Sequence, residues 1–229
     1  MRIITLNANG IRSAAGKGLF DWFKRQRADV LCLQETRAER EQLVDAHYFP
    51  RGWHVHYHVA RSKRGYSGVA IYARREPDAV FDTLGWAPFD EEGRYLELRC
   101  GQLSVVSLYL PSGSSSEERQ AFKYRVLEWL TPKLAEWRAS GREYVLCGDW
   151  NIAHRPIDLR NWRANQKNSG FLPGERAWLD HAFEKLGWVD AYRALKPEAA
   201  EYTWWSNRGQ AWANDVGWLI DYHVVTPGL

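Results

Sequence analysis

The 229-residue sequence lacks several features that would assign its class at once. It has only three cysteines, Cys32, Cys100 and Cys147, and each lies inside an apolar run. An odd number of buried thiols suits a reducing cytoplasm and not a disulfide framework. No apolar run approaches the roughly 18 to 20 residues that a bilayer span needs. The apolar stretch at residues 1–7 is too short for a signal peptide. We therefore expect a soluble, cytoplasmic protein without a membrane segment.

A large excess of charge of either sign is also missing. The chain has 31 Lys and Arg against 28 Asp and Glu, so a polyanion partner would need the basic residues gathered on one face. Segments 61–66 and 155–167 have that character, although charge runs are just as typical of solvated loops. With 45% apolar and 14% aromatic residues, the chain can bury a sizeable core, which argues against disorder. We expect most of the thirteen tryptophans to lie in that core.

No repeat, low-complexity tract or linker divides the chain, so we expect a single domain over residues 1–229. Short β-rich runs bounded by Gly, Asp, Asn and Pro predict strands at 2–6, 30–33, 53–59, 69–73, 95–99, 103–110, 144–147 and 219–225. Helical spacing of apolar residues predicts helices at 19–27, 117–140 and 173–186. Ser115 and Glu118 predict a capping box for the second helix, Pro132 a kink or break within it, and Gly187 the end of the third. This order favours a layered α/β protein with mixed or antiparallel sheets.

Polar residues suited to chemistry stand where several of these strands end. They are Asn7, Glu35, Tyr109, Asp149, Asn151 and Asp221. Except for Tyr109, they offer carboxylate and amide oxygens, which suit Mg²⁺ or Mn²⁺ better than zinc. Any one of them alone is more typical of a cap or a loop hydrogen bond. Their recurrence at successive strand ends favours a shared metal site.

Five motifs occur in a fixed order and carry a family resemblance. They are LNANGIR at 6–12, LQETR at 33–37, YLPSG at 109–113, GDWNIAH at 148–154 and GWLIDY at 217–222. The series resembles the exonuclease III branch of the endonuclease/exonuclease/phosphatase superfamily, the bacterial apurinic/apyrimidinic (AP) endonucleases. Residues 165–176 are similar to that family's DNA-contacting loop and following helix. The resemblance covers residues 1–229.

The resemblance implies both a fold and an activity. The implied fold is a four-layered α/β sandwich of two mixed, mainly antiparallel sheets packed face to face and flanked by helices. The implied activity is Mg²⁺-dependent (Mn²⁺ as a substitute) cleavage of DNA phosphodiesters in base-excision repair. Cleavage would occur 5′ to abasic sites or at 3′ ends, as a 3′–5′ exonuclease or 3′-phosphodiesterase. The partner would be double-stranded DNA with such lesions, bound by a monomer.

Carried over by position, the resemblance assigns roles at the chemical centre. Glu35 would be the main metal ligand, helped by Asn7. Asp149 would orient or deprotonate the attacking water, which Asn151 positions, and Tyr109 would contact the scissile phosphate. A cation, hydrogen-bond donors and an in-line water are what a charged pentavalent transition state requires.

The resemblance assigns a second set to DNA binding. This substrate-binding set comprises Arg37, Asn165, Asn168, Trp204, Trp218 and Ile220. The last three match walls of a pocket that would accept a flipped sugar without its base. For these three residues, ordinary core packing is the competing interpretation.

Asp221, which the resemblance assigns to catalysis, would orient a histidine partner.

The sequence departs from the family pattern near its end. The family has a final strand with Ser-Asp-His, and the chain stops at residue 229 before that motif. We therefore expect the last C-terminal strand to be missing, the domain to be C-terminally incomplete, and catalysis and stability to be impaired. His223 does not match the missing histidine by position. Asp215 and Leu219 replace the family's Asn and Arg, which would weaken DNA affinity more than chemistry.

Two other functions compete with the nuclease. The catabolite repression control proteins are similar relatives that act as non-catalytic RNA-binding repressors. They have lost the residues that match Glu35, Asp149 and Asn151, all present here, so an enzyme is favoured. A lipid phosphodiesterase of the same superfamily is disfavoured by the loop at 165–176.

A histidine-rich strand offers a different metal. His54, His56 and His58 alternate along one strand face at a spacing that zinc accepts. A solvated face, with Val55 and Tyr57 buried on the other side, explains the pattern more simply.

Overall fold

The computed structural model describes residues 1–229, and the chain folds into two compact units. Unit 1 comprises Met1–Tyr109 and Val145–Asp149, and unit 2 comprises Leu110–Tyr144 and Trp150–Leu229. No helix is both long and apolar enough to cross a membrane. The expectation of one domain over the whole chain stays a prediction.

Helices separate single strands and groups of strands along the chain. The strands are Ile3–Asn7 (β1), Val30–Gln34 (β2), His54–His58 (β3), Val69–Ala73 (β4), Ala79–Phe81 (β5), Tyr95–Cys100 (β6), Leu103–Tyr109 (β7), Glu143–Asp149 (β8), Val189–Asp190 (β9), Trp204–Trp205 (β10), Gly217–Trp218 (β11) and Asp221–Val225 (β12). The α-helices are Ile11–Gly16 (α1), Leu19–Arg25 (α2), Ala87–Asp90 (α3), Glu117–Ala139 (α4), Trp162–Asn165 (α5), Pro173–Asp180 (α6) and Ala191–Leu195 (α7). Shorter helical turns are Arg40–Gln42 (η1), Ala46–Tyr48 (η2), Pro156–Asp158 (η3) and the π-helical His181–Lys185 (η4). The strands form a four-stranded, a six-stranded and a two-stranded sheet, so the fold is mixed α/β with two large sheets.

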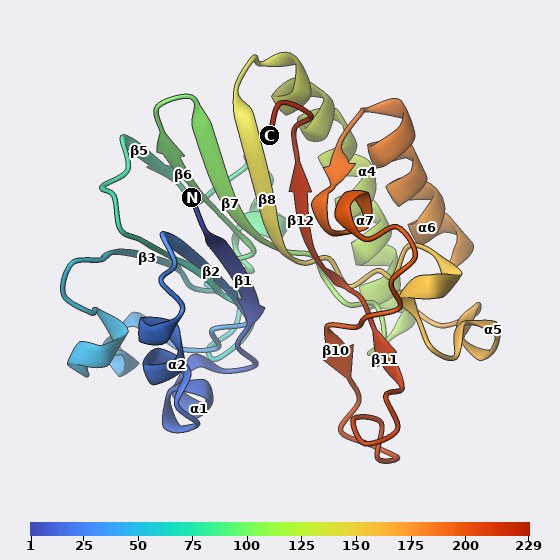
Figure 1. Cartoon of the computed structure of the whole chain (residues 1–229), viewed down its shortest axis with the longest axis horizontal. Coiled ribbons are helices and arrows are strands. Elements are labelled where there is room, and N and C mark those ends of the chain that lie inside the picture. Colours follow the sequence, from blue (N-terminus) through green and yellow to red (C-terminus); the bar gives the residue numbers. More distant parts are fainter. The chain divides into compact units, whose positions relative to one another are not determined.

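The first sheet of unit 1 has the order β1-β2-β4-β3. β1 and β2 run parallel, and the other two pairings are antiparallel. Every residue of β2 is buried, as expected for a central strand covered on both faces. On one face, Phe20 and Phe23 of α2 pack with Leu31, Leu33 and Tyr72 of the sheet. Figure 1 shows α1 and α2 beside this sheet.

The second set of strands in unit 1 is ordered β5-β6-β7-β8. Its β7 faces β2 of the first sheet, because Gln34 Nε2 donates to Ser107 Oγ (2.9 Å), which donates to Leu33 O (3.0 Å). Gly148 in β8 has φ +148°, and a Cβ there would lie 1.8 Å from Leu108 O. Only glycine fits this approach, which delivers the next residue, Asp149, to the end of the strand.

Helix α4 is the longest element of unit 2 and differs from its prediction in two ways. Ser116, not Ser115, caps it by accepting from Arg119 N at 3.2 Å. Pro132 does not break the helix, which runs on to Ala139. Buried Leu130 and Leu134 pack on either side of the proline. We attribute the continuity to this packing, which outweighs the hydrogen bond that proline cannot make.

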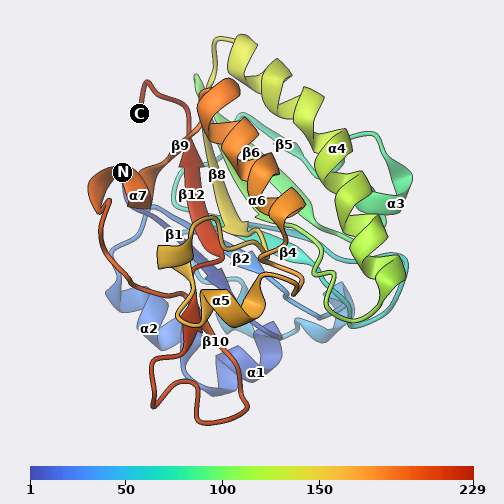
Figure 2. The same cartoon turned by 90° about the vertical axis from the view of Figure 1, so that its right-hand side faces the viewer.

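Helix α6 lies alongside α4 in both views (Figures 1 and 2). The Trp178 indole of α6 donates to Thr131 Oγ1 of α4 at 2.9 Å. The third predicted helix begins at Pro173 and changes to the π-helical turn η4 after Asp180. Gly187, at φ +73°, follows its end as predicted.

The remaining strands of unit 2 are short. β12 pairs antiparallel with β9, and β10 pairs antiparallel with β11 through Trp204 opposite Trp218. β9, β10 and β11 have two residues each, which is too few for an alternating pattern to be recognised.

Two expectations about burial are wrong in part. Cys32 and Cys147 are buried, but Cys100 is partly exposed because it ends β6 at a turn. Only three tryptophans, at 137, 150 and 188, are buried, and Trp204 and Trp212 are exposed. The large indole ring can cover apolar surface while one edge stays in water.

Candidate active site

Unit 1 brings together four of the predicted catalytic and metal-binding residues. Asn7 ends β1, Glu35 follows β2, Tyr109 ends β7 and Asp149 ends β8. Asn7 Nδ2 donates to Glu35 Oε1 (3.0 Å) and to Asp149 Oδ2 (2.8 Å). The Tyr109 hydroxyl donates to Glu35 Oε1 at 2.6 Å. We call these four residues the carboxylate cluster.

The backbone around Glu35 is held in an uncommon conformation. Glu35 and Arg37 have φ of 51° and 47°, in the left-handed region that non-glycine residues seldom occupy. Main-chain hydrogen bonds fix this turn, with Thr36 N donating to Gly68 O (3.1 Å) and Gly10 N to Glu35 O (2.8 Å). A Cβ on Gly68 would lie 2.4 Å from Thr36 Oγ1. Strain maintained in this way is a mark of functional sites.

The cluster has the chemistry of a site for a hard cation. Glu35 and Asp149 contribute two carboxylates, and Arg37 forms an ion pair with Glu35 Oε2. Carboxylate and amide oxygens suit Mg²⁺, which takes one or two carboxylates and keeps several waters. The amide oxygen of Asn7 accepts from Asn9 N at 2.9 Å, so the amide nitrogen faces the carboxylates. The two carboxylates therefore fit a divalent ion directly, and Asn7 orients them.

Sequence reasoning missed Arg94, which holds Tyr109. Its guanidinium is buried, lies 4.5 Å from the centre of the Tyr109 ring and donates through Nη1 to Tyr109 O at 3.1 Å. It also donates to the Tyr66 hydroxyl (3.0 Å) and to Glu92 Oε2 (2.6 Å). Burial raises the pKa of Tyr109 far above its usual range, and the nearby Glu35 raises that pKa further. The phenol therefore keeps its proton and acts as a hydrogen-bond donor.

The other predicted site residues, apart from Arg37, belong to unit 2. Asn151 has φ 53°, and its Nδ2 donates to Leu110 O at 2.9 Å. Asn168 is exposed and donates through Nδ2 to Asn165 Oδ1 at 2.8 Å, so these two predicted DNA contacts lie side by side.

The three predicted pocket residues come together within unit 2. Trp204 and Trp218 face each other across β10 and β11, with ring centres 6.3 Å apart and planes at 86°. Ile220 packs in a small apolar cluster with Phe171, and Trp218 lies against that cluster. Trp204 is 44% exposed, so ordinary core packing does not explain it. Ile220 is buried in the cluster against which the Trp218 indole packs.

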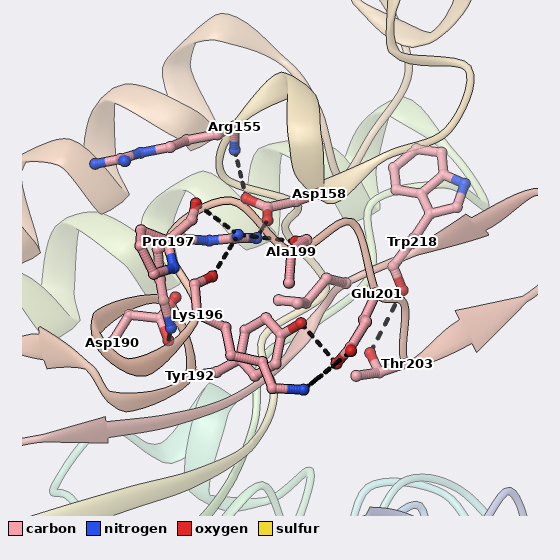
Figure 3. A network of polar contacts seen from close by, with 12 residues as sticks. Arg155, Asp158, Asp190, Tyr192, Lys196, Pro197, Ala199, Glu201, Thr203 and Trp218 are labelled. Carbon is pink, nitrogen blue, oxygen red and sulfur yellow. Dashed lines mark hydrogen bonds and ion pairs between the residues drawn. The ribbon is translucent and has the colours of Figure 1, made fainter.

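A polar network that includes the buried Arg193 and Asp158 reaches Trp218 (Figure 3). Arg193 forms an ion pair with Asp158 and donates through Nη1 to the carbonyls of the chain at residues 196, 197 and 199. Asp158 O accepts from Leu219 N at 2.8 Å, and Trp218 O accepts from Thr203 N at 2.8 Å. These two hydrogen bonds hold the peptide group between Trp218 and Leu219 from both sides.

The departures near Asp221 have different consequences. Asp221 lies at the start of β12, and its N–H donates to Thr203 Oγ1 at 3.2 Å. Asp215 accepts from Trp205 Nε1 at 3.2 Å and so has a structural partner. Leu219 is buried, and the expected effect of this replacement on DNA affinity stays a prediction.

The histidine-rich strand β3 does not have a wholly solvated histidine face. His58 is buried, and its Nδ1 is 2.9 Å from Tyr95 O. Val55 and Tyr57 are only partly buried, although both pack against the apolar core between α2 and the first sheet. The strand is covered near its end by β6, which the alternating pattern could not indicate.

Comparison with known proteins identifies the family of this chain. Residues 4–229 match the model of the Endonuclease/Exonuclease/phosphatase family, and the chain belongs to this family. Enzymes of this family act with a divalent metal ion. Family membership and the predicted fold class are thereby confirmed.

Individual relatives match over nearly the whole chain. An exodeoxyribonuclease of Bacillus subtilis is 36% identical over 100% of this chain and 89% of its own length. The DNA repair nuclease APEX1 of Danio rerio is 34% identical over 100% of this chain and 74% of its own.

Two solved structures show the same fold. An AP endonuclease from Archaeoglobus fulgidus has a TM-score of 0.89 and 31% identity, covering 99% of this chain and 87% of its own. The 3′ phosphatase NExo from Neisseria, bound to a product DNA hairpin, has a TM-score of 0.88 and 26% identity, covering 98% and 86%.

Proposed function

We propose that this protein is a DNA repair nuclease that hydrolyses phosphodiester bonds with the aid of Mg²⁺. The carboxylate cluster carries the proposal, because its two carboxylates, amide and phenol are joined by direct hydrogen bonds. The nuclease relatives support the same conclusion and favour it over a non-catalytic RNA-binding repressor.

Each member of the cluster has a distinct task in this proposal. Glu35 holds the metal ion, which when bound offsets negative charge on the phosphate. Asp149 orients the attacking water and accepts its proton, and Asn7 Nδ2 fixes the carboxylate in position for that step. The Tyr109 hydroxyl donates a hydrogen bond to a phosphate oxygen. Asn151 positions the water. Arg37, which lies beside Glu35, binds the DNA backbone. Orientation of a histidine by Asp221 stays a prediction.

The proposed substrate is double-stranded DNA with an abasic site or a 3′ end. Trp204, Trp218 and Ile220 offer an apolar wall that a sugar without its base can enter. Asn165 and Asn168 present amides that can bond to phosphate oxygens without reading sequence. A monomer acting in the cytoplasm is part of the same proposal.

A cleavage assay tests this function. A labelled duplex with one abasic site is incubated with the protein and Mg²⁺, with and without a chelator, beside the intact duplex. We expect a cut at the abasic site that the chelator abolishes. Undiminished cleavage in chelator, or no cleavage of either duplex, would contradict the proposal.

A further inference from the structure

A buried ion pair joins helices α4 and α6 in unit 2. Lys123 of α4 and Glu175 of α6 are both 0% exposed, and Nζ lies 2.6 Å from Oε1. Removing two such charges from water costs as much as their attraction returns, so an apolar pair of the same size would hold the helices equally well. Stability alone therefore does not account for this pair.

The lysine end of the pair contacts the segment that follows Asp149. Lys123 Nζ donates to the main-chain oxygen of Asn151 at 2.8 Å. Asn151 is in the left-handed region, a conformation that needs support from its surroundings. The ammonium thus holds the backbone of a residue to which we assign the positioning of water.

The glutamate end contacts the loop that carries the predicted DNA contacts. Glu175 Oε2 accepts from Gly170 N (2.7 Å) and Leu172 N (3.0 Å), and Oε1 accepts from Gln120 Nε2 (3.1 Å). The loop from Asn165 to Gly170 is therefore anchored at its far end by this carboxylate.

Gly170 lies between the groups that the two ends of the pair hold, because its N–H donates to Glu175 and it lies next to Asn151 O, which Lys123 binds. Its φ is +91°, and a Cβ there would lie 3.2 Å from both Asn151 O and a ring carbon of Trp218. Ala153 N donates to Gly170 O at 2.8 Å. A displacement of Gly170 would therefore be passed to Asn151 and to the pocket wall.

We propose that Lys123 and Glu175 form a positioning pair that couples the DNA-contacting loop at 165–172 to Asn151. Binding of a DNA backbone to this loop is thereby linked to the placement of Asn151, to which we assign the positioning of water. The inference rests on the proposed function for its kinetic consequence, but the coupling itself can be measured without DNA. Neither residue touches the reacting atoms, so both act through Asn151 and Gly170.

The kinetic test uses Lys123→Met, which keeps the length of the side chain and removes its donors. Lys133→Met on the same helix is the matched control, because Lys133 pairs only with Glu136 at the surface. We expect kcat on the abasic duplex to fall about 10- to 100-fold in Lys123→Met, since small misplacement of a catalytic group has effects of this size. KM should rise by a smaller factor, and Lys133→Met should match the wild type.

A double variant guards against loss of the fold. In Lys123→Met with Glu175→Gln neither buried group is charged, so the core regains stability while the coupling stays lost. A folded double variant with wild-type kcat and KM, assayed well below its melting temperature, would show that the pair is only structural.

Hydrogen exchange tests the coupling independently of the function. In the DNA-free protein, Lys123→Met should speed exchange of the amides of Gly170 and Leu172 at least several-fold, although Lys123 does not contact them. Amides of the carboxylate cluster in unit 1 should exchange at the wild-type rate. Unchanged exchange at Gly170 and Leu172 would overturn the proposal, whereas absence of cleavage by the wild type with altered exchange would overturn only the proposed function.

Discussion

The two units hold their proposed functional residues in different ways. In unit 1 the functional side chains contact one another directly, with Asn7 bridging Glu35 and Asp149, and Tyr109 donating to Glu35. In unit 2 buried charged side chains hold the main chain, as Lys123 holds that of Asn151 and Glu175 that of Gly170. Direct contacts at the ends of sheet strands fix geometry closely, whereas loops anchored through the backbone can vary in sequence.

This difference separates two kinds of mutational effect. Changes in unit 1 should lower kcat for every substrate, because the same groups stabilise any phosphodiester transition state. Changes in the exposed residues of unit 2 should alter KM and the choice of substrate.

The largest effect is expected for Asp149→Asn. The amide keeps an oxygen for Asn7 Nδ2 but cannot accept a proton from water, so kcat should fall about 10³-fold or more. Thermal unfolding should stay close to that of the wild type. Single-turnover cleavage of the abasic duplex measures the loss, and a rate near that of the wild type would remove Asp149 from the mechanism.

Glu35→Ala should act on the metal requirement. Loss of one of two carboxylates should raise the Mg²⁺ concentration for half-maximal activity about tenfold or more, with part of the rate recovered at high Mg²⁺. The measurement is a Mg²⁺ titration of the cleavage rate. Glu41→Ala, at an exposed site, is the control, and identical curves for the two variants would contradict the role of Glu35.

Arg94→Lys should lower kcat about tenfold through Tyr109. Lysine keeps the charge but loses the planar contact with the Tyr109 ring and the donors to Tyr66 and Glu92. The same change made on Tyr109→Phe should have much less effect on kcat, since the hydroxyl it positions is gone. Equal losses in both backgrounds would show that Arg94 does not act through that hydroxyl.

Trp204→Ala should have the smallest effect on the cleavage rate but a clear effect on the choice of substrate. Removal of the exposed indole opens the wall beside Trp218, so preference for the abasic over the intact duplex should drop several-fold. Trp212→Ala, 71% exposed on the same hairpin, provides the comparison. Unaltered preference in Trp204→Ala would make the pocket assignment wrong.

The sequence predicted the parts of the molecule whose signals are local. Strands such as Val69–Ala73 were predicted to the residue, and the carboxylate cluster was predicted because its members follow β-rich runs within recognisable motifs. Motif order also indicated the fold, which no periodicity within a single segment could define.

The residues that the sequence did not reveal act over long separations. Arg94, Lys123, Glu175 and Arg193 are buried ions, and charged residues normally indicate a solvated face. Lys123 and Glu175 are paired across 52 positions, and Asp158 and Arg193 across 35, so no window of sequence contains both partners. Only the folded chain brings α4 to α6, and α7 to η3, so that these partners meet.

Direct binding of a metal ion tests the central claim most directly. Mn²⁺ binding to the DNA-free protein, followed by electron paramagnetic resonance, is compared among the wild type, Glu35→Gln, Asp149→Asn and Glu41→Gln. We predict that the first two variants bind Mn²⁺ at least about tenfold more weakly than the wild type, whereas Glu41→Gln binds it equally well. Equal binding by all four proteins would contradict a metal site in the carboxylate cluster.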